Sequence, residues 1–99
     1  MINIIFLHGL LGAKEDWQKV IENLPYFNCI ALDLPFHGKA KGIEVTNFEE
    51  TAEYLEQQIK SAVKNEPYFL VGYSLGGRIA LYYALQAQVE RSNLQGVIL

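Results

Sequence analysis

Short, largely apolar runs alternate with stretches of helical periodicity along this chain of 99 residues. The runs cover residues 2–7, 27–34, 68–71 and 97–99, and glycine or proline follows closely after each of the first three. Continuous apolar runs of this length are typical of strands buried on both faces of a parallel sheet. We therefore expect four strands, the last of them only begun at Val97.

Helices are expected between these strands. A helix over residues 13–23, ended by Pro25, is predicted because apolar residues recur there at positions i, i+3, i+4 and i+7. A second helix is expected after a cap at Thr46 or Asn47. Its inward stripe would consist of Phe48, Ala52, Leu55, Ile59 and Val63. The third helix, around residues 79–85, is apolar on nearly every side, which is normal only for a buried helix.

The resulting order, β-α-β-α-β-α-β, predicts an α/β fold: a parallel sheet with helices on both faces and right-handed crossovers. All 99 residues would form one partial domain. The chain ends inside an apolar strand, which would leave that strand edge and one side of the third helix uncovered. We expect a domain truncated after the start of its fourth strand and lacking its C-terminal half. The alternative is a small natural domain that ends in an edge strand.

Composition narrows the class of protein. The net charge is −3 and the basic residues are scattered, so no nucleic-acid-binding face is indicated. The N-terminal apolar run is far shorter than the roughly 20 residues that span a bilayer, and it lacks a signal-peptide pattern. A single cysteine, Cys29, excludes an internal disulfide and lies mid-strand, where it would be buried and inert. We expect a cytoplasmic protein with no membrane partner.

The sequence Gly72-Tyr73-Ser74-Leu75-Gly76 has the G-x-S-x-G pattern of a nucleophile elbow. The pattern alone is weak, but here a predicted strand runs into it and a predicted helix follows. A sharp turn between the two would lift the Ser74 hydroxyl clear of the sheet, and the glycines would prevent collisions. The alternative is a serine in an ordinary glycine-rich turn.

A second glycine-containing segment, His8-Gly9-Leu10-Leu11-Gly12, follows the first strand. An oxyanion hole needs converging amide donors, which we expect from Leu75 and from Leu10 or Leu11. Both segments would meet at a crevice if strands one and three are neighbours, because the chain then reverses its winding direction between them. We expect structural roles for His8, His37 and Asp33, although either histidine could be mistaken for a catalytic one.

Three motifs in this order resemble the α/β-hydrolase superfamily: the H-G-x-x-G loop at residue 8, the D-x-P-x-H-G turn at residues 33–38, and the elbow. Phe36 stands where superfamily members usually have glycine, so the shape of that turn is open. The resemblance implies a Ser-His-Asp triad whose acid and histidine follow the serine in the chain. Both would lie beyond Leu99, so we expect the isolated chain to be inactive and poorly stable.

Within the superfamily, Leu7–Gly12 with Asp16-Trp17, Leu32–Pro35 and G-Y-S-L-G-G-R at residues 72–78 resemble the 2-succinyl-6-hydroxy-2,4-cyclohexadiene-1-carboxylate synthases of menaquinone biosynthesis. This resemblance implies a lyase that removes pyruvate from 2-succinyl-5-enolpyruvyl-6-hydroxy-3-cyclohexene-1-carboxylate. The lyase that the resemblance implies requires no cofactor and no metal.

The substrate of that family is a small polycarboxylate, and Arg78 could bind one of its carboxylates. The alternative for Arg78 is an ordinary surface arginine. Tyr73 would line the pocket by the same analogy, or pack beside the sheet, whereas Trp17 is expected mainly in the helix core. Two other functions stay open: a carboxylesterase or related hydrolase of this fold, and a binding module without catalysis.

Overall fold

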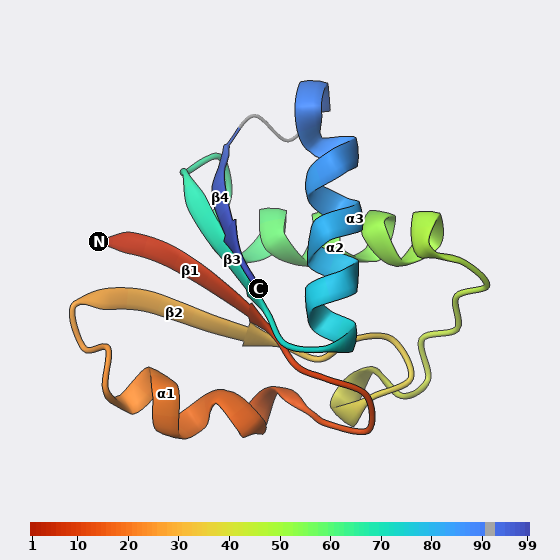
Figure 1. The fold of residues 1–99 in the computed structure, drawn as a ribbon, viewed down its shortest axis with the longest axis horizontal. Coiled ribbons are helices and arrows are strands. Elements are labelled where there is room, and N and C mark those ends of the chain that lie inside the picture. The colour runs from red at the N-terminus through yellow and green to blue at the C-terminus, as the bar shows by residue number, and fades with distance from the viewer. Residues whose placement is uncertain (91–92) are drawn as a thin grey trace.

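The computed structural model describes residues 1–90 and 93–99. Its strands are β1 (Ile2–Leu7), β2 (Phe27–Leu32), β3 (Tyr68–Gly72) and β4 (Leu94–Ile98). Its α-helices are α1 (Gln18–Glu22), α2 (Phe48–Val63) and α3 (Leu75–Glu90), and its 3-10 helices are η1 (Lys14–Trp17) and η2 (Gly38–Ala40). The strands form one parallel sheet in the order β2-β1-β3-β4 (Figure 1). The predicted α/β class and the predicted strand order are both confirmed.

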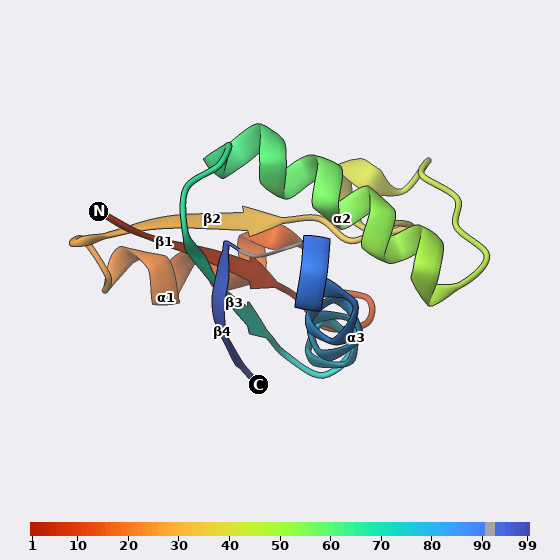
Figure 2. The same ribbon diagram turned by 90° about the horizontal axis from the view of Figure 1, so that it is seen from above.

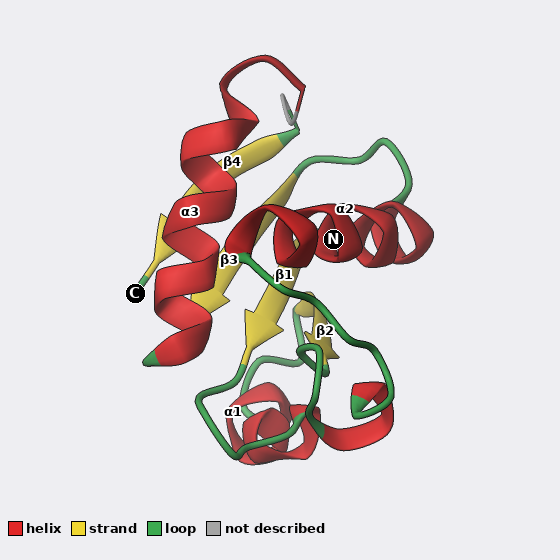
Figure 3. Ribbon diagram, turned by 90° about the vertical axis from the view of Figure 1, so that its right-hand side faces the viewer, coloured by secondary structure: helices red, strands yellow, loops and turns green. Residues whose placement is uncertain are grey.

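Helices cover both faces of the sheet. Viewed from three directions, α1 lies on one side, and α2 and α3 lie on the other (Figure 1, Figure 2, Figure 3). The side chains of β1 alternate accordingly. Ile5 and Leu7 belong to the core cluster that includes α2 and α3, whereas the Phe6 ring packs on Trp17 of η1 at a centroid distance of 4.9 Å.

Two predicted helices differ from the structure in detail. The expected helix over residues 13–23 is divided into η1 and α1, and it buries no residue completely. Asn47 caps α2 by accepting the Glu50 N–H, while the Glu50 carboxylate accepts the Thr46 N–H. The expected stripe of α2 is buried except for Phe48, which is 45% exposed, and Thr51 is buried in addition. Phe48 lies at the first turn, at the edge of the core, and its ring contacts Tyr82.

The strand boundaries shift by two or three residues. β2 ends at Leu32, two residues before the end of its apolar run, because the carboxylate of Asp33 binds backbone amides of the following loops. β4 begins at Leu94, three residues before the expected start, so Gln95 and Gly96 lie within it. No local pattern indicates this earlier start, because neither residue is a strand former.

The predicted apolar helix α3 is covered on one side only. Ile79, Ala80 and Tyr83 are buried against the sheet, whereas Leu81 and Leu85 are exposed. This agrees with the expectation that one side of the helix would be left open. No helix in the described part of the chain is long and apolar enough to cross a membrane.

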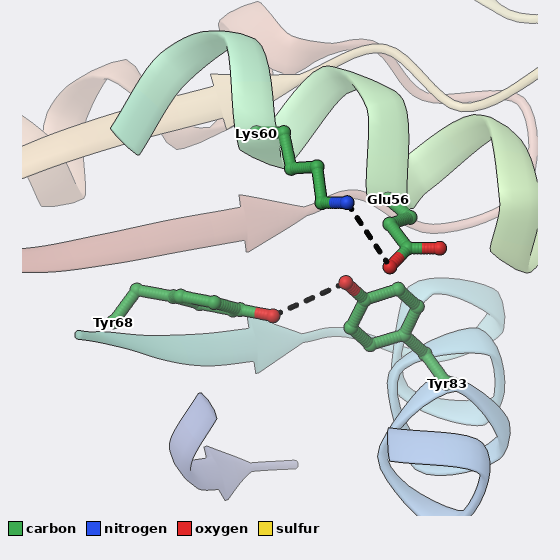
Figure 4. A network of polar contacts seen from close by, with 4 residues as sticks. All are labelled: Glu56, Lys60, Tyr68 and Tyr83. Atoms are coloured by element: carbon green, nitrogen blue, oxygen red, sulfur yellow. Dashed lines mark hydrogen bonds and ion pairs between the residues drawn. The ribbon is translucent and has the colours of Figure 1, made fainter. Parts of the chain in front are cut away.

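A buried polar contact fastens α3 to the sheet. The hydroxyls of Tyr68 on β3 and Tyr83 on α3 lie 3.1 Å apart, with both side chains almost fully buried. Figure 4 shows this pair beneath α2, where the exposed Lys60 approaches Glu56 at 3.9 Å. Buried hydroxyls are stabilising only when they are hydrogen-bonded, so this contact helps to fix the helix that begins immediately after Ser74.

Candidate active site

Ser74 occupies a sharp turn between β3 and α3. Its φ is +55°, in the left-handed region that non-glycine residues rarely adopt. The turn is closed by the Gly76 N–H donating to the Tyr73 carbonyl at 2.9 Å, and α3 continues from it through an Arg78 N–H bond to the Ser74 carbonyl. Ser74 is exposed, and none of the described residues hydrogen-bonds its hydroxyl. This is the backbone geometry of a nucleophile elbow.

The glycines on either side of Ser74 are required by close packing. A Cβ at Gly72 would collide with the carbonyl of Gly76, across the elbow itself. A Cβ at Gly76 would collide with the carbonyl oxygens of Leu7 and His8, at the end of the neighbouring strand. The elbow is therefore pressed against the point where β1 ends.

The loop after β1 faces Ser74. The Tyr73 N–H donates to the Leu7 carbonyl at 3.1 Å, which joins the two strand ends. A Cβ built on Gly9 would lie 3.5 Å from the Ser74 Cβ and in close contact with the Tyr73 ring. Residues 9–12 form a β-turn closed by the Gly12 N–H donating to the Gly9 carbonyl at 3.0 Å. Ser74 and this turn thus adjoin each other at the predicted crevice.

The two amides expected from this turn differ in their availability. The Leu11 N–H donates to Nε2 of His37 at 2.9 Å. The Leu10 N–H has no acceptor among the described residues, and neither has the Leu75 N–H in the first turn of α3. The structure therefore leaves Leu10 and Leu75 as the available pair of donors beside Ser74. The contact between His37 and Leu11 joins residues 26 positions apart, and no local sequence signal indicates it.

Both ring nitrogens of His8 bind backbone groups. Its side chain is 1% exposed, Nδ1 donates to the Gly9 carbonyl at 2.8 Å, and Nε2 accepts the Leu34 N–H at 3.0 Å. Both ring nitrogens are therefore engaged in binding the loops together. This agrees with the structural role expected for His8.

Asp33 joins the loops that follow β1 and β2. Its carboxylate accepts the Lys14 N–H at 2.8 Å and the Lys39 N–H at 3.1 Å. Burial acts to raise the pKa of this carboxyl, but the two backbone hydrogen bonds, together with the positive charge of Lys14, lower the pKa below its ordinary value of 3.8. Asp33 thus has the structural role expected for it.

The turn that follows Asp33 keeps a glycine-type conformation at Phe36. The φ of Phe36 is +69°, so this residue adopts the left-handed backbone that glycine adopts most easily. The question left open by the sequence is answered: the Phe36 backbone is left-handed, at the cost of some strain. Cys29, by contrast, is half-buried on β2, and burial raises the pKa of its thiol, which favours the unreactive protonated form.

Two hollows lie beside the turn of residues 9–12. One, of about 310 Å³, is bordered by Leu10, Tyr73, Trp17, Val20 and Asp16, together with residues of the turn. The other, of about 360 Å³, is mostly apolar and lies between Leu10, Leu75 and the loop of residues 34–37. Trp17 therefore both packs on the sheet and borders a pocket, and its buried indole N–H has no partner among the described residues.

The remaining predicted site residues lie on the exposed side of the elbow. Tyr73 is 68% exposed beside Ser74. Arg78 is exposed one helical turn after Ser74 and makes no ion pair with any described acidic residue. It does not border either hollow. His37 is turned towards Leu11 and Pro35, so none of the described histidines hydrogen-bonds to Ser74.

These features define the class of protein. The chain belongs to the α/β-hydrolase family, whose model, described as alpha/beta hydrolase fold, matches residues 2–99. An alpha/beta superfamily hydrolase from Oenococcus oeni has the same fold with a TM-score of 0.85 and 29% identity, over 98% of this chain and 36% of that one. The fold corresponds to the N-terminal portion of an α/β hydrolase.

Two relatives within the family share one activity in their names. A Haemophilus influenzae protein, assigned provisionally as a 2-succinyl-6-hydroxy-2,4-cyclohexadiene-1-carboxylate synthase, is 89% identical over all of this chain and 40% of its own length. The synthase of Serratia proteamaculans is 40% identical over 97% of this chain and 36% of its own length. The structure of MenH from S. aureus matches 84% of this chain and 32% of its own with a TM-score of 0.72 and 36% identity. The chain thus spans well under half the length of these relatives.

Proposed function

We propose that this chain carries the nucleophile elbow of a serine-triad lyase that eliminates pyruvate from 2-succinyl-5-enolpyruvyl-6-hydroxy-3-cyclohexene-1-carboxylate. The observation that carries the proposal is the surroundings of Ser74. Its exposed side chain adjoins a turn with a free Leu10 amide, and a guanidinium follows one helical turn later. The names of the similar synthases state the product, 2-succinyl-6-hydroxy-2,4-cyclohexadiene-1-carboxylate, and the substrate is the one that the sequence resemblance implies.

In this reaction Ser74 acts through its alkoxide. A base takes the hydroxyl proton, and the alkoxide then removes a proton from a ring carbon of the substrate. The electron pair of the broken C–H bond moves towards the adjacent carbonyl, and the amides of Leu10 and Leu75 stabilise the negative oxygen. A double bond then forms in the ring as the C–O bond to the enolpyruvyl group breaks. The departing enolpyruvate takes up a proton and becomes pyruvate, so all atoms are accounted for.

Two further groups are needed for this chemistry. Because none of the described histidines hydrogen-bonds to Ser74, we assign the base and its acid partner to residues outside this chain's 99 positions. Without a base, a serine hydroxyl is a weak nucleophile and a weak base. We therefore propose that these 99 residues are inactive alone, and that a separately expressed C-terminal part would restore the elimination.

The substrate's carboxylates give Arg78 a function. Its guanidinium is exposed, makes no ion pair with described residues, and follows Ser74 by one turn, so it is free to form a bidentate contact with a carboxylate. Tyr73, beside the nucleophile, would border the same bound molecule.

The test is pyruvate release by the full-length protein, followed by a coupled lactate dehydrogenase assay. We expect Ser74→Ala to lower kcat by about 10⁴-fold or more, as loss of a catalytic serine does elsewhere. Wild-type protein that releases no pyruvate would contradict the proposal.

A carboxylesterase is the second candidate, and the hollow between Tyr73 and the turn of residues 9–12 favours it. Leu10, Trp17, Val20 and Tyr73 give this hollow largely apolar walls, and the Asp16 carboxylate borders it, which would repel a polycarboxylate. Hydrolysis of p-nitrophenyl esters without pyruvate release would favour the esterase. Failure of Ser74 to react with a fluorophosphonate probe would instead favour a binding module without catalysis.

A further inference from the structure

The turn of residues 9–12 has an unfavourable backbone at its third position. Leu11 has a φ of +64°, which is strained for a residue with a Cβ. Its side chain is 90% exposed, so packing of the leucine does not hold the turn in this shape. The internal bond from Gly12 to the Gly9 carbonyl closes the turn, and groups outside the turn hold it further.

Two histidines supply these groups, one for each side of Leu10. His8 donates from Nδ1 to the Gly9 carbonyl at 2.8 Å, and Nε2 of His37 accepts the Leu11 N–H at 2.9 Å. Their rings also pack together, with centroids 5.0 Å apart. The Leu10 N–H belongs to the same peptide as the Gly9 carbonyl, and, unlike the Leu11 N–H, it has no acceptor among the described residues.

The protonation of His37 follows from its partners. The Pro35 carbonyl, 2.9 Å from Nδ1, can only accept, so Nδ1 carries the proton. The Leu11 N–H can only donate, so Nε2 presents its lone pair. His37 is therefore a neutral imidazole that connects the loop after β2 to the loop after β1.

We propose that His37 is a positioning residue for the oxyanion hole, which keeps the turn of residues 9–12 in the shape that presents the Leu10 N–H, through its bond to the next peptide at Leu11. This inference rests on the proposed function, in which Leu10 stabilises the developing negative charge. Such a donor acts only when it is aimed at the oxygen in advance. Loss of the His37 acceptor would let the strained Leu11 residue rotate, which would weaken the turn that closes from Gly12 onto the Gly9 carbonyl. The Gly9–Leu10 peptide, and the Leu10 N–H with it, would then lose part of the support that fixes its direction.

A matched pair of amide substitutions tests the proposal. Glutamine can place an oxygen near the position of Nε2, so His37→Gln keeps an acceptor for Leu11. Asparagine is one methylene shorter and reaches only the position of Nδ1, so His37→Asn keeps the donor to Pro35 and loses the acceptor. Both variants are neutral, and circular dichroism and thermal unfolding check that each is folded.

In the full-length protein we expect H37N to lower kcat for pyruvate release about tenfold or more, with KM changed less than about twofold. H37Q should keep kcat within about threefold of wild type. Equal activity of H37N and wild type, or equal losses in both variants, would overturn the proposal. A purely structural role would lower thermal stability without this contrast in kcat.

Two additional measurements keep the outcomes distinct. If wild type hydrolyses p-nitrophenyl esters but releases no pyruvate, the proposed lyase function fails, and the same contrast in ester hydrolysis still decides the role of His37. If wild type performs neither reaction, both proposals fail. Hydrogen exchange at the Leu11 amide is a second measurement that does not require H37N to fold. We expect this amide to be protected in wild type and in H37Q. Unprotected exchange in wild type would overturn the inference.

Discussion

Gly76, at the start of α3, packs against the carbonyl oxygen of Leu7, at the end of β1, with no room between them for a methyl group. This contact brings the first turn of a helix against the end of a strand almost 70 positions earlier in the sequence. It fixes the distance between the elbow and the turn of residues 9–12. The arrangement of the site therefore depends on the absence of one side chain.

We expect Gly76→Ala to lower the free energy of unfolding of the full-length protein by about 1–3 kcal/mol, as overpacking in a core does. Alanine gains about 1 kcal/mol in helix propensity, but its Cβ would collide with two carbonyl oxygens. Gly42→Ala is the control, because a Cβ there meets no atom within 4 Å, and it should change stability by less than about 0.5 kcal/mol. Urea unfolding compares the two, and equal stabilities would contradict the packing argument.

The backbone conformation of Ser74 should lower the stability of the protein, although the proposed activity requires the serine hydroxyl. Ser74→Gly and Ser74→Ala both remove the hydroxyl, but only glycine adopts a φ of +55° without strain. We expect the glycine variant to be more stable than the alanine variant by about 1 kcal/mol, and both to lose the proposed activity. Thermal unfolding in parallel with the pyruvate assay measures both effects. A more stable alanine variant would show that the serine backbone is not strained.

Asp33 should cause the stability of the protein to fall at acid pH. Its pKa is lowered in the folded state, so its contribution is fully present above the unfolded pKa of about 3.9 and is lost as the pH falls through the folded value. We expect Asp33→Asn to lower stability at pH 7 by about 1–3 kcal/mol, since an amide oxygen can replace only one of the two acceptors. Between pH 4 and 2.5, stability should fall less steeply in this variant than in wild type. Parallel slopes in urea unfolding at these pH values would contradict the assignment.

Substitution of Arg78 should weaken the binding of negatively charged substrates and leave neutral substrates almost unaffected. If its guanidinium binds a carboxylate, Arg78→Gln should raise KM for the polycarboxylate about 10-fold to 100-fold, which corresponds to loss of a charge-assisted contact of roughly 1.5–3 kcal/mol. Hydrolysis of neutral p-nitrophenyl acetate, where it occurs, should change less than about twofold. Arg78→Lys retains the charge but not the bidentate geometry, so its KM should lie between those of wild type and R78Q. An unchanged KM in R78Q would make Arg78 an ordinary surface residue.

The sequence predicted the elbow well because its signals are local. A strand, a serine between two glycines and a following helix are adjacent in the chain, and their steric requirements are met within a few residues. The strand order followed from the need to bring two loops to one crevice. The details that were wrong, such as the burial of Phe48 and the start of β4, depend on where the core ends, which periodicity does not report.

The sequence by itself determined the order of the elements, the parallel sheet and the residue presented at the elbow, because apolar periodicity and glycine chemistry act over short distances. The tertiary structure decided which amide beside Ser74 is free. His37 reaches Leu11 across 26 positions, and His8 reaches Leu34 across the same separation. Hydrogen bonds between distant loops form only after the sheet has brought the loops together, so local sequence patterns could not reveal that Leu10, and not Leu11, keeps its N–H available.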